Sequence, residues 1–282
     1  MSAPVPPRSQ VDDCVDPDGA GGLDRTAMTG GADTDVGVER DGDVAVVEIR
    51  RPPNNFFDVE LIRDIADALD ELATGGCRAV VLASQGRHFC AGADFSGGRD
   101  RPAGGPHLYD MAIRLFEQPL PIVAAVQGAA IGGGFGLAMA ADFRVAAPEA
   151  RFAANFARLG FHHGFGLSVT LPLVAGHQTS LELLYTGRRI DGAEAHRLGI
   201  ADRLVELDEL RERALDLARE IATSAPLAVR SIRETMRGHL ADEVRRALVR
   251  ERAEQDRLAA TADWREGVRA MAERRTPVFR GE

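Results

Sequence analysis

The sequence predicts one large α/β domain, in which short buried strands alternate with helices and a run of helices follows. The first observation is the alternation itself: short continuous apolar runs, typical of buried strands, alternate with segments whose apolar residues recur every three or four positions. The second is a pair of glycine-containing turns, at 91–94 and 132–134, where predicted strands end. The third is composition, because 282 residues with 45% hydrophobic content suffice for one large core and a small appendage.

Each element is predicted from its own pattern. A β-rich run at 44–49 is ended by prolines, which cannot donate to a sheet. Apolar residues at helical spacing predict a helix at 59–72, which the Gly75-Gly76 pair ends. Continuous apolar runs at 79–83 and 122–126 indicate buried parallel strands. The other predicted elements are a strand at 143–146 and helices at 108–116, 134–140, 167–174, 181–185, 193–198, 210–223, 227–240 and 243–272.

Two segments are expected to lie outside the packed core. Residues 1–36 are rich in Pro, Gly, Asp and Ser, so they cannot bury enough surface to offset their ordering entropy and are expected to be disordered. No apolar stretch follows Met1, which argues against a signal peptide. A second segment, rich in Gly, Arg and Pro, runs to Pro106 and is expected to be a mobile binding loop.

Charge and composition exclude several classes of function. A formal net charge of −9 argues against nucleic-acid binding as the main function, which needs a concentrated basic surface. The chain has no lysine, which excludes a Schiff base or a lysine general base. No apolar run approaches the roughly 18 residues needed to span a membrane. The three cysteines are too few for a disulfide framework and lack metal-ligand spacing, so we expect a cytoplasmic protein without a bound metal.

The two glycine-containing turns indicate the chemistry. Both use small residues, so that the backbone can approach a ligand closely. Gly132-Gly133-Gly134 also opens a helix, whose first N–H groups lack intrahelical partners and carry partial positive charge. A carbonyl oxygen held between one N–H from each turn would gain two fixed donors. An enolate or a tetrahedral oxyanion at that point would gain more than the ground state does.

The triple glycine has two other interpretations. A dinucleotide-binding turn fits poorly, because the spacing is not G-x-G-x-x-G and no acidic residue ends a following strand about 20 residues later. A purely structural role, in which glycine lets a helix pack closely on a strand, stays open on the residues alone.

The turns belong to a larger set of motifs that resembles the enoyl-CoA hydratase/isomerase (crotonase) superfamily. The resemblance extends from about residue 40 to the C-terminus, and the paired glycine motifs are its most specific part. The matching stretches, in order, are 54–56 after Arg51-Pro52, 88–94, 123–142, 184–190 with 197–202, 225–228, and the ending from Glu266-Gly267 to 277–279.

This resemblance implies a fold and an assembly. The fold would be the ClpP/crotonase fold, a β-β-α spiral of two stacked sheets that occupies residues 37–225 and carries the acyl-CoA site. Residues 226–282 would form a helical region that assembles homotrimers or dimers of trimers.

The same resemblance implies the binding site. The N–H groups of Ala91 and Gly133 are expected to form the oxyanion hole for an acyl-CoA thioester. Coenzyme A would arrive as part of the substrate, so no separate cofactor is expected. The residues expected to bind the coenzyme A moiety are Ala91, Gly92, Ala93, Asp94 and Gly133.

The sequence departs from the hydratases of this family at the two positions that move protons. Those enzymes hold a water between two glutamates, because one carboxylate takes a proton from water while the other delivers one to the α-carbon. Gly136 stands at the first glutamate position and Phe156 at the second. Neither can transfer a proton, so syn-hydration of a 2-enoyl-CoA is doubtful. The second position also serves the Δ3–Δ2 isomerases, so that activity is doubtful too.

Histidines are the remaining acid–base candidates. Histidine is the side chain whose ordinary pKa lies near neutral, and the loop that carries His162 and His163 is expected beside the acyl pocket, so either is a candidate catalytic residue. One could instead cap the next helix while the other faces solvent. His107 and Asp94 are weaker candidates, and strand alternation is expected to direct His88 away from the pocket.

Two classes of function therefore compete. The first is an acyl-CoA enzyme that works through an enolate, as a hydratase or isomerase, or as a hydrolase, decarboxylase or C–C lyase that uses His162 or His163. The second is a non-catalytic acyl-CoA binding protein, or more weakly an assembly partner in a lipid-enzyme complex. If two of four phenylalanines line the pocket, a long or aromatic acyl group is favoured; these are Phe135, Phe156, Phe161 and Phe165.

Overall fold

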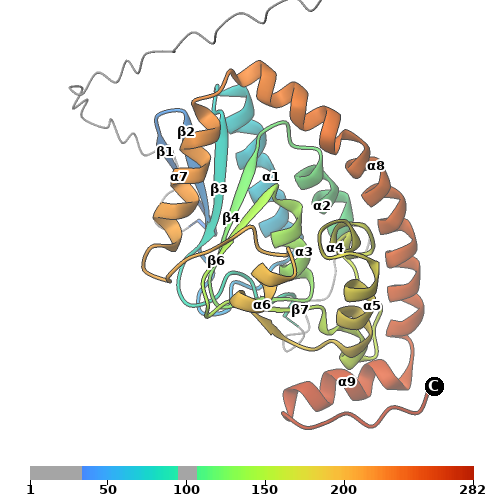
Figure 1. Cartoon of the computed structure of the whole chain (residues 1–282). Coiled ribbons are helices and arrows are strands. Elements are labelled where there is room, and N and C mark those ends of the chain that lie inside the picture. Colours follow the sequence, from blue (N-terminus) through green and yellow to red (C-terminus); the bar gives the residue numbers. More distant parts are fainter. Residues whose placement is uncertain (1–33, 95–106) are drawn as a thin grey trace, which may run out of the picture.

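The fold is built on a large six-stranded β-sheet with helices on both of its faces (Figure 1). It was analysed as a computed structural model that describes residues 34–94 and 107–282. The first two strands form an antiparallel hairpin, and all later neighbours pair in parallel. In order across the sheet, the strands are β1 (Val36–Asp41), β2 (Val44–Ile49), β3 (Ala79–Ser84), β4 (Ile122–Val126), β6 (Phe143–Ala146) and β9 (Arg203–Leu204).

Both faces of this sheet are buried, which explains the continuous apolar runs in β3 and β4. Along β3, Val80 and Leu82 face the main core, while Val81 faces a second, smaller cluster. The main core includes α1 (Val59–Thr74), α2 (Leu108–Phe116) and α3 (Gly133–Ala140). The smaller cluster is formed with α7 (Leu210–Ala222), which lies alone on the opposite face in Figure 1.

A second, three-stranded sheet lies next to the glycine turns. Its strands are β5 (Ala129–Ile131), β7 (Arg151–Ala153) and β8 (Ile190–Asp191). The β5–β7 pair is parallel and the β7–β8 pair is antiparallel. The sequence does not predict these strands, because two or three residues show too little periodicity to be recognised.

The C-terminal part is helical, as predicted, but the helices are divided differently. The predicted break near residue 241 is wrong: α8 (Pro226–Ala259) is continuous, and the break comes before α9 (Ala262–Ala272). No proline interrupts α8 after its first turn, whereas Thr261 caps α9 by accepting a hydrogen bond from the N–H of Trp264. The remaining helices are a 3-10 helix η1 (Asn155–Leu159), α4 (Leu167–Ala175), α5 (His177–Thr186) and α6 (Gly192–Arg197).

The predicted strands and helices of the core are otherwise confirmed to within a few residues at their ends. In the large sheet, the edge strands β1 and β9 were not predicted, and β1 begins at Val36, the last residue of the segment expected to be disordered. Residues 1–33 of that segment and the expected binding loop at 95–106 lie outside the described residues. None of the helices in the described ranges is long and apolar enough to cross a membrane.

Candidate functional site

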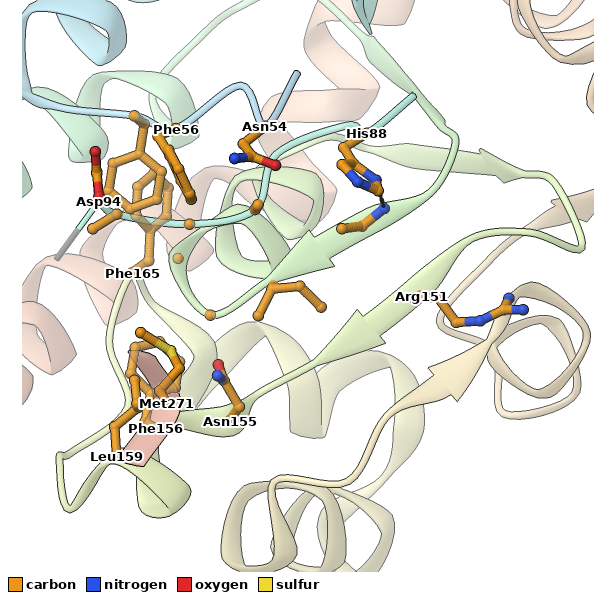
Figure 2. Close-up of a pocket in the computed structure, with 18 of the residues that line it drawn as sticks. Asn54, Phe56, His88, Asp94, Arg151, Asn155, Phe156, Leu159, Phe165 and Met271 are labelled. Carbon is orange, nitrogen blue, oxygen red and sulfur yellow. Dashed lines mark hydrogen bonds between the residues drawn. The ribbon is translucent and has the colours of Figure 1, made fainter. Parts of the chain in front are cut away.

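Both glycine turns open into one cavity of about 1010 Å³. Its wall is formed by the turns, the small sheet, the start of α2 and residues from α8 and α9. Figure 2 shows an apolar end, where Phe156, Leu159 and Met271 lie together and Phe165 lies near Phe56. Arg151 lies at the opposite end of this view, with the two turns between.

The two turns are hydrogen-bonded directly to each other. The N–H of Cys90 donates to the carbonyl of Ala129 (2.8 Å), and the N–H of Ile131 donates to the carbonyl of Cys90 (3.0 Å). A Cβ at Gly134 would lie 2.1 Å from the Cys90 carbonyl oxygen, and one at Gly92, where φ is +95°, would lie 2.8 Å from the Ile131 carbonyl oxygen. Glycine is therefore required at both positions, because any side chain would push the turns apart.

On the first turn, the open donor is Ala93 and not Ala91. The N–H of Ala91 donates to the carbonyl of Asn54 (2.9 Å), so it cannot bind a ligand, and the expectation for Ala91 is wrong on this point. The next N–H, that of Gly92, is directed at the Cys90 sulfur. The N–H of Ala93 has no hydrogen-bond partner among the described residues, and Ala93 lines the cavity. Sequence reasoning missed this shift because hydrogen bonds to Asn54 depend on the tertiary fold.

On the second turn, the open donor is Gly133, as expected. Gly133 is the first residue of α3, and the carbonyl of Gly132 accepts hydrogen bonds from the N–H groups of Phe135 and Gly136. Within the described ranges, nothing accepts a hydrogen bond from the N–H of Gly133, which faces the same cavity as Ala93. The helix terminus adds partial positive charge at this point. The pair Ala93 and Gly133 can thus polarise one oxygen atom.

Aromatic rings pack around the two positions at which the resemblance leads us to expect the hydratase glutamates, Gly136 and Phe156. A Cβ at Gly136 would lie 2.5 Å from the Cβ of Phe165, so Phe165 occupies the space that a side chain at 136 would need. Phe165 is 1% exposed and has φ +59°, a strained backbone conformation for a bulky residue. Its ring packs against Phe57 with centroids 5.6 Å apart. Phe156, at the second position, lines the cavity directly.

The four phenylalanines expected near the acyl group divide into two sets. Phe156, Phe161 and Phe165 line the cavity, so the expectation of an aromatic pocket is supported. Phe135 instead points into the core, where its ring centroid lies 5.4 Å from that of Phe152.

The two candidate catalytic histidines do not line the cavity. Nδ1 of His162 donates to the carbonyl of His163 (2.7 Å), and Nε2 of His163 lies 2.8 Å from the hydroxyl of Ser168, which donates to buried Glu251. Burial, followed by the nearby His162, lowers the pKa of His163 to about 4, so its ring is neutral at pH 7. These contacts direct the two rings toward Ser168 and away from the described cavity wall, and a catalytic role for either histidine stays a prediction.

Other expected residues are placed as follows. His107 caps α2, since its Nδ1 accepts a hydrogen bond from the N–H of Tyr109 (3.0 Å). His88 lines the cavity against expectation, and its Nδ1 accepts from the N–H of Ala129 (3.1 Å). Burial and then the charge of Arg87 lower the pKa of His88. Asp94 is exposed at the cavity edge, as Figure 2 shows.

A cationic cluster that the sequence analysis missed surrounds the other end of the cavity. We define it as Arg87, Arg151 and Arg189, with Glu149 as the carboxylate beside it. Arg151 Nη1 donates only to the backbone carbonyls of its own turn, and no ion pair involves any of the three arginines within the described part of the chain. The cluster is hard to find from the sequence, because its members come from three separate segments and resemble ordinary surface arginines.

The packing of Phe165 over Gly136 gives a stability prediction. Gly136→Ala should destabilise the fold by about 1–3 kcal/mol, because the added methyl overpacks a filled site. Gly238→Ala on α8 is the control, because the nearest atom to a new Cβ there is the flexible Cγ of Glu234 at 3.6 Å. For this variant we expect the free energy of unfolding to stay unchanged or to rise by up to about 1 kcal/mol. Urea unfolding measures both, and adding Phe165→Gly, which removes both the Cβ and the ring of Phe165, should remove most of the extra cost at 136. Equal effects at 136 and 238 would contradict the packing.

Comparison with known proteins agrees with this geometry. The family model for enoyl-CoA hydratase/isomerase matches residues 39–282. The chain is 34% identical over 250 residues to a carnitinyl-CoA dehydratase of Proteus mirabilis, and the match covers 85% of this chain and 96% of the relative. It is 30% identical over 250 residues to a 1,2-epoxyphenylacetyl-CoA isomerase of Escherichia coli, and that match covers 85% of this chain and 95% of the relative. A solved enoyl-CoA hydratase/isomerase from Pseudoalteromonas atlantica superimposes with a TM-score of 0.81 at 31% identity, covering 88% of this chain and all of that one. The chain therefore belongs to the enoyl-CoA hydratase/isomerase (crotonase) family and has its fold.

Proposed function

We propose that the protein binds acyl-CoA thioesters and holds the thioester oxygen between the N–H groups of Ala93 and Gly133. The observation that carries this proposal is a backbone donor on each turn that has no partner among residues 34–94 and 107–282, both on the wall of a single cavity. Such donors favour an oxygen that gains negative charge, so they stabilise an enolate or an oxyanion more than the neutral thioester.

The two ends of the cavity match the two ends of an acyl-CoA. The end lined by Phe156, Phe161 and Phe165 provides an apolar surface for an acyl chain or ring. The cationic cluster at the other end matches the phosphates of coenzyme A, because arginine binds phosphate oxygens through paired N–H groups. Coenzyme A then serves as part of the substrate and not as a resident cofactor.

The reaction is proposed to run through a thioester enolate without the two-glutamate hydration mechanism. Phe165 packs over Gly136, and Phe156 takes the second position, so neither position supplies a carboxylate to hold and split a water. Isomerisation, hydrolysis, decarboxylation and C–C cleavage all remain compatible with a stabilised enolate or oxyanion. Among the relatives, one is named an isomerase and one a dehydratase of a CoA ester, so different reactions of CoA esters occur among similar proteins.

Turnover of a thioester panel tests the enzymatic proposal. The protein is incubated in D2O with enoyl-, β-keto- and malonyl-type CoA thioesters, and each is followed by mass spectrometry. We expect product, or deuterium at the α-carbon, from at least one class, because a stabilised enolate exchanges its α-proton. Binding of these thioesters without product or exchange would instead establish a non-catalytic acyl-CoA binding protein.

Substitution of Gly133 tests the placement of the donors. Gly133→Ala and Gly133→Pro add the same Cβ, which would lie 2.3 Å from Cζ of Phe57, but only proline also removes the N–H. Proline should therefore cost about 10²–10³-fold more in turnover than alanine does.

A spectroscopic measurement on the unmodified protein completes this test. Infrared spectroscopy of a bound 13C-labelled thioester should show its carbonyl stretch lowered in frequency, and the shift should be reduced in Gly133→Pro. An unshifted carbonyl stretch in the wild-type complex would contradict the placement even if both variants fail to fold.

We further propose that α8 assembles the chain into trimers or dimers of trimers. Its exposed face carries large apolar side chains, including Leu227 (78% exposed), Ile232, Met236 and Val249 (71% exposed), which is unusual for a surface in contact with water. Light scattering should give a mass about three or six times the chain mass of 30.3 kDa. Ile232→Asp with Met236→Asp should lower that mass, while a purely monomeric wild type would rule the assembly out.

A further inference from the structure

The side-chain amide of Asn155 lies in the cavity wall beside the second glycine turn. The N–H of Gly132 donates to the carbonyl of Ala153 (2.8 Å), which ties the end of β7 to this turn. Two residues after Ala153, the Oδ1 atom of Asn155 lies so near the turn that a Cβ at Gly132 would be 3.5 Å from it. Figure 2 shows the amide directed toward the turns, with Phe156 beside it. The amide is therefore close to the open N–H of Gly133, the next residue of the turn.

The backbone around Asn155 is held in place, while its amide is left open to a ligand. Asn155 is the first residue of η1, and Nε of Arg158 in the same helix donates to the carbonyl of Thr186 (2.6 Å) at the end of α5. A Cβ at Gly187 would lie 3.1 Å from the Cα of Asn155, so the chain after α5 covers the backbone on that side. Within the described part of the chain, no group forms a hydrogen bond with the Asn155 amide, and neither of its polar atoms is buried. A molecule in the cavity can therefore reach both atoms.

The chemistry of the amide suits it to recognition and not to proton transfer. An asparagine side chain offers both a donor and an acceptor, and it does not titrate. Its neighbours on this part of the wall include the apolar side chains of Phe156 and Leu159. A purely apolar acyl group that covers the amide would remove its water without replacing the hydrogen bond, whereas an oxygen on the acyl group would replace it. Sites of this kind reject the analogue that lacks the matching polar group.

We propose that Asn155 is a specificity-determining residue that hydrogen-bonds an oxygen on the acyl carbons next to the thioester, and that acyl-CoA thioesters with an oxygen substituent at C2 or C3 are the preferred ligands. A thioester oxygen held at the N–H of Gly133 places C1 beside the same turn. Because consecutive residues are only about 3.8 Å apart, the contact with Asn155 falls a few bonds further along the acyl group. This inference rests on the acyl-CoA binding proposed above and names the class of acyl group.

Three thioesters of equal chain length test the inference by isothermal titration calorimetry. They are hexanoyl-CoA and the racemic 2-hydroxyhexanoyl-CoA and 3-hydroxyhexanoyl-CoA. The wild type should bind at least one hydroxylated thioester about tenfold more tightly than hexanoyl-CoA, and the one that responds identifies the carbon that carries the oxygen. Equal affinities for all three thioesters would overturn the proposal.

Asn155→Leu keeps the size of the side chain and removes both hydrogen-bonding groups. It should abolish the preference by weakening only the hydroxylated thioester, while hexanoyl-CoA binds as tightly as before or more tightly. Gln178→Leu is the matched control, because it removes an exposed amide of α5 that does not line the cavity. An unchanged preference in Asn155→Leu would also overturn the inference. If Asn155→Leu fails to fold, the three affinities of the wild type decide alone. Binding of none of the three thioesters would instead refute the acyl-CoA proposal on which the inference rests.

Discussion

The site depends on the two hydrogen bonds through which Cys90 joins the first turn to β5. These bonds come from the backbone, so they set the spacing of the turns whatever the side chains are. The spacing is small enough that Gly92 and Gly134 each face a carbonyl oxygen of the other turn at a distance that excludes a Cβ. Cys90 itself is fully buried, and burial raises the pKa of its thiol to about 12, so it acts as packing and not as a nucleophile.

Because the N–H groups of Ala93 and Gly133 are held in place by the backbone, the side chains that line the rest of the cavity can change without moving them. A pair of backbone N–H groups recognises a developing negative charge and imposes no particular reaction. In this chain, Phe165 and Phe156 make one end of the cavity apolar. Phe165 is held in a left-handed conformation by its burial against Phe57 and Gly136, so packing offsets a backbone strain of about 1–3 kcal/mol.

Sequence patterns predicted the scaffold well and the site in part. Long periodic segments such as α1 and α7 could be predicted, because each carries its own apolar stripe. Gly133 could be placed, since a glycine cluster at a helix start is a local signal. The shift from Ala91 to Ala93 could not be predicted, because it depends on which N–H the distant Asn54 carbonyl accepts. The orientation of His162 and His163 could not be predicted for a similar reason: Glu251, which is remote in sequence, holds Ser168, and Ser168 contacts His163.

Two side chains of α8 help to orient the loop at 162–168. Glu251, which is fully buried, accepts hydrogen bonds from the N–H groups of Gly166 and Ser168. Gln255 lies one turn later on the same face of the helix; it donates to the carbonyl of His162 and accepts from the hydroxyl of Tyr109. The opposite face of that helix carries the exposed apolar side chains. One continuous helix, α8, thus contacts the loop that lines the cavity through one face and carries exposed side chains on the other. Because Glu251 and Gln255 both hold the loop at 162–168, the position of α8 sets the position of that part of the cavity wall.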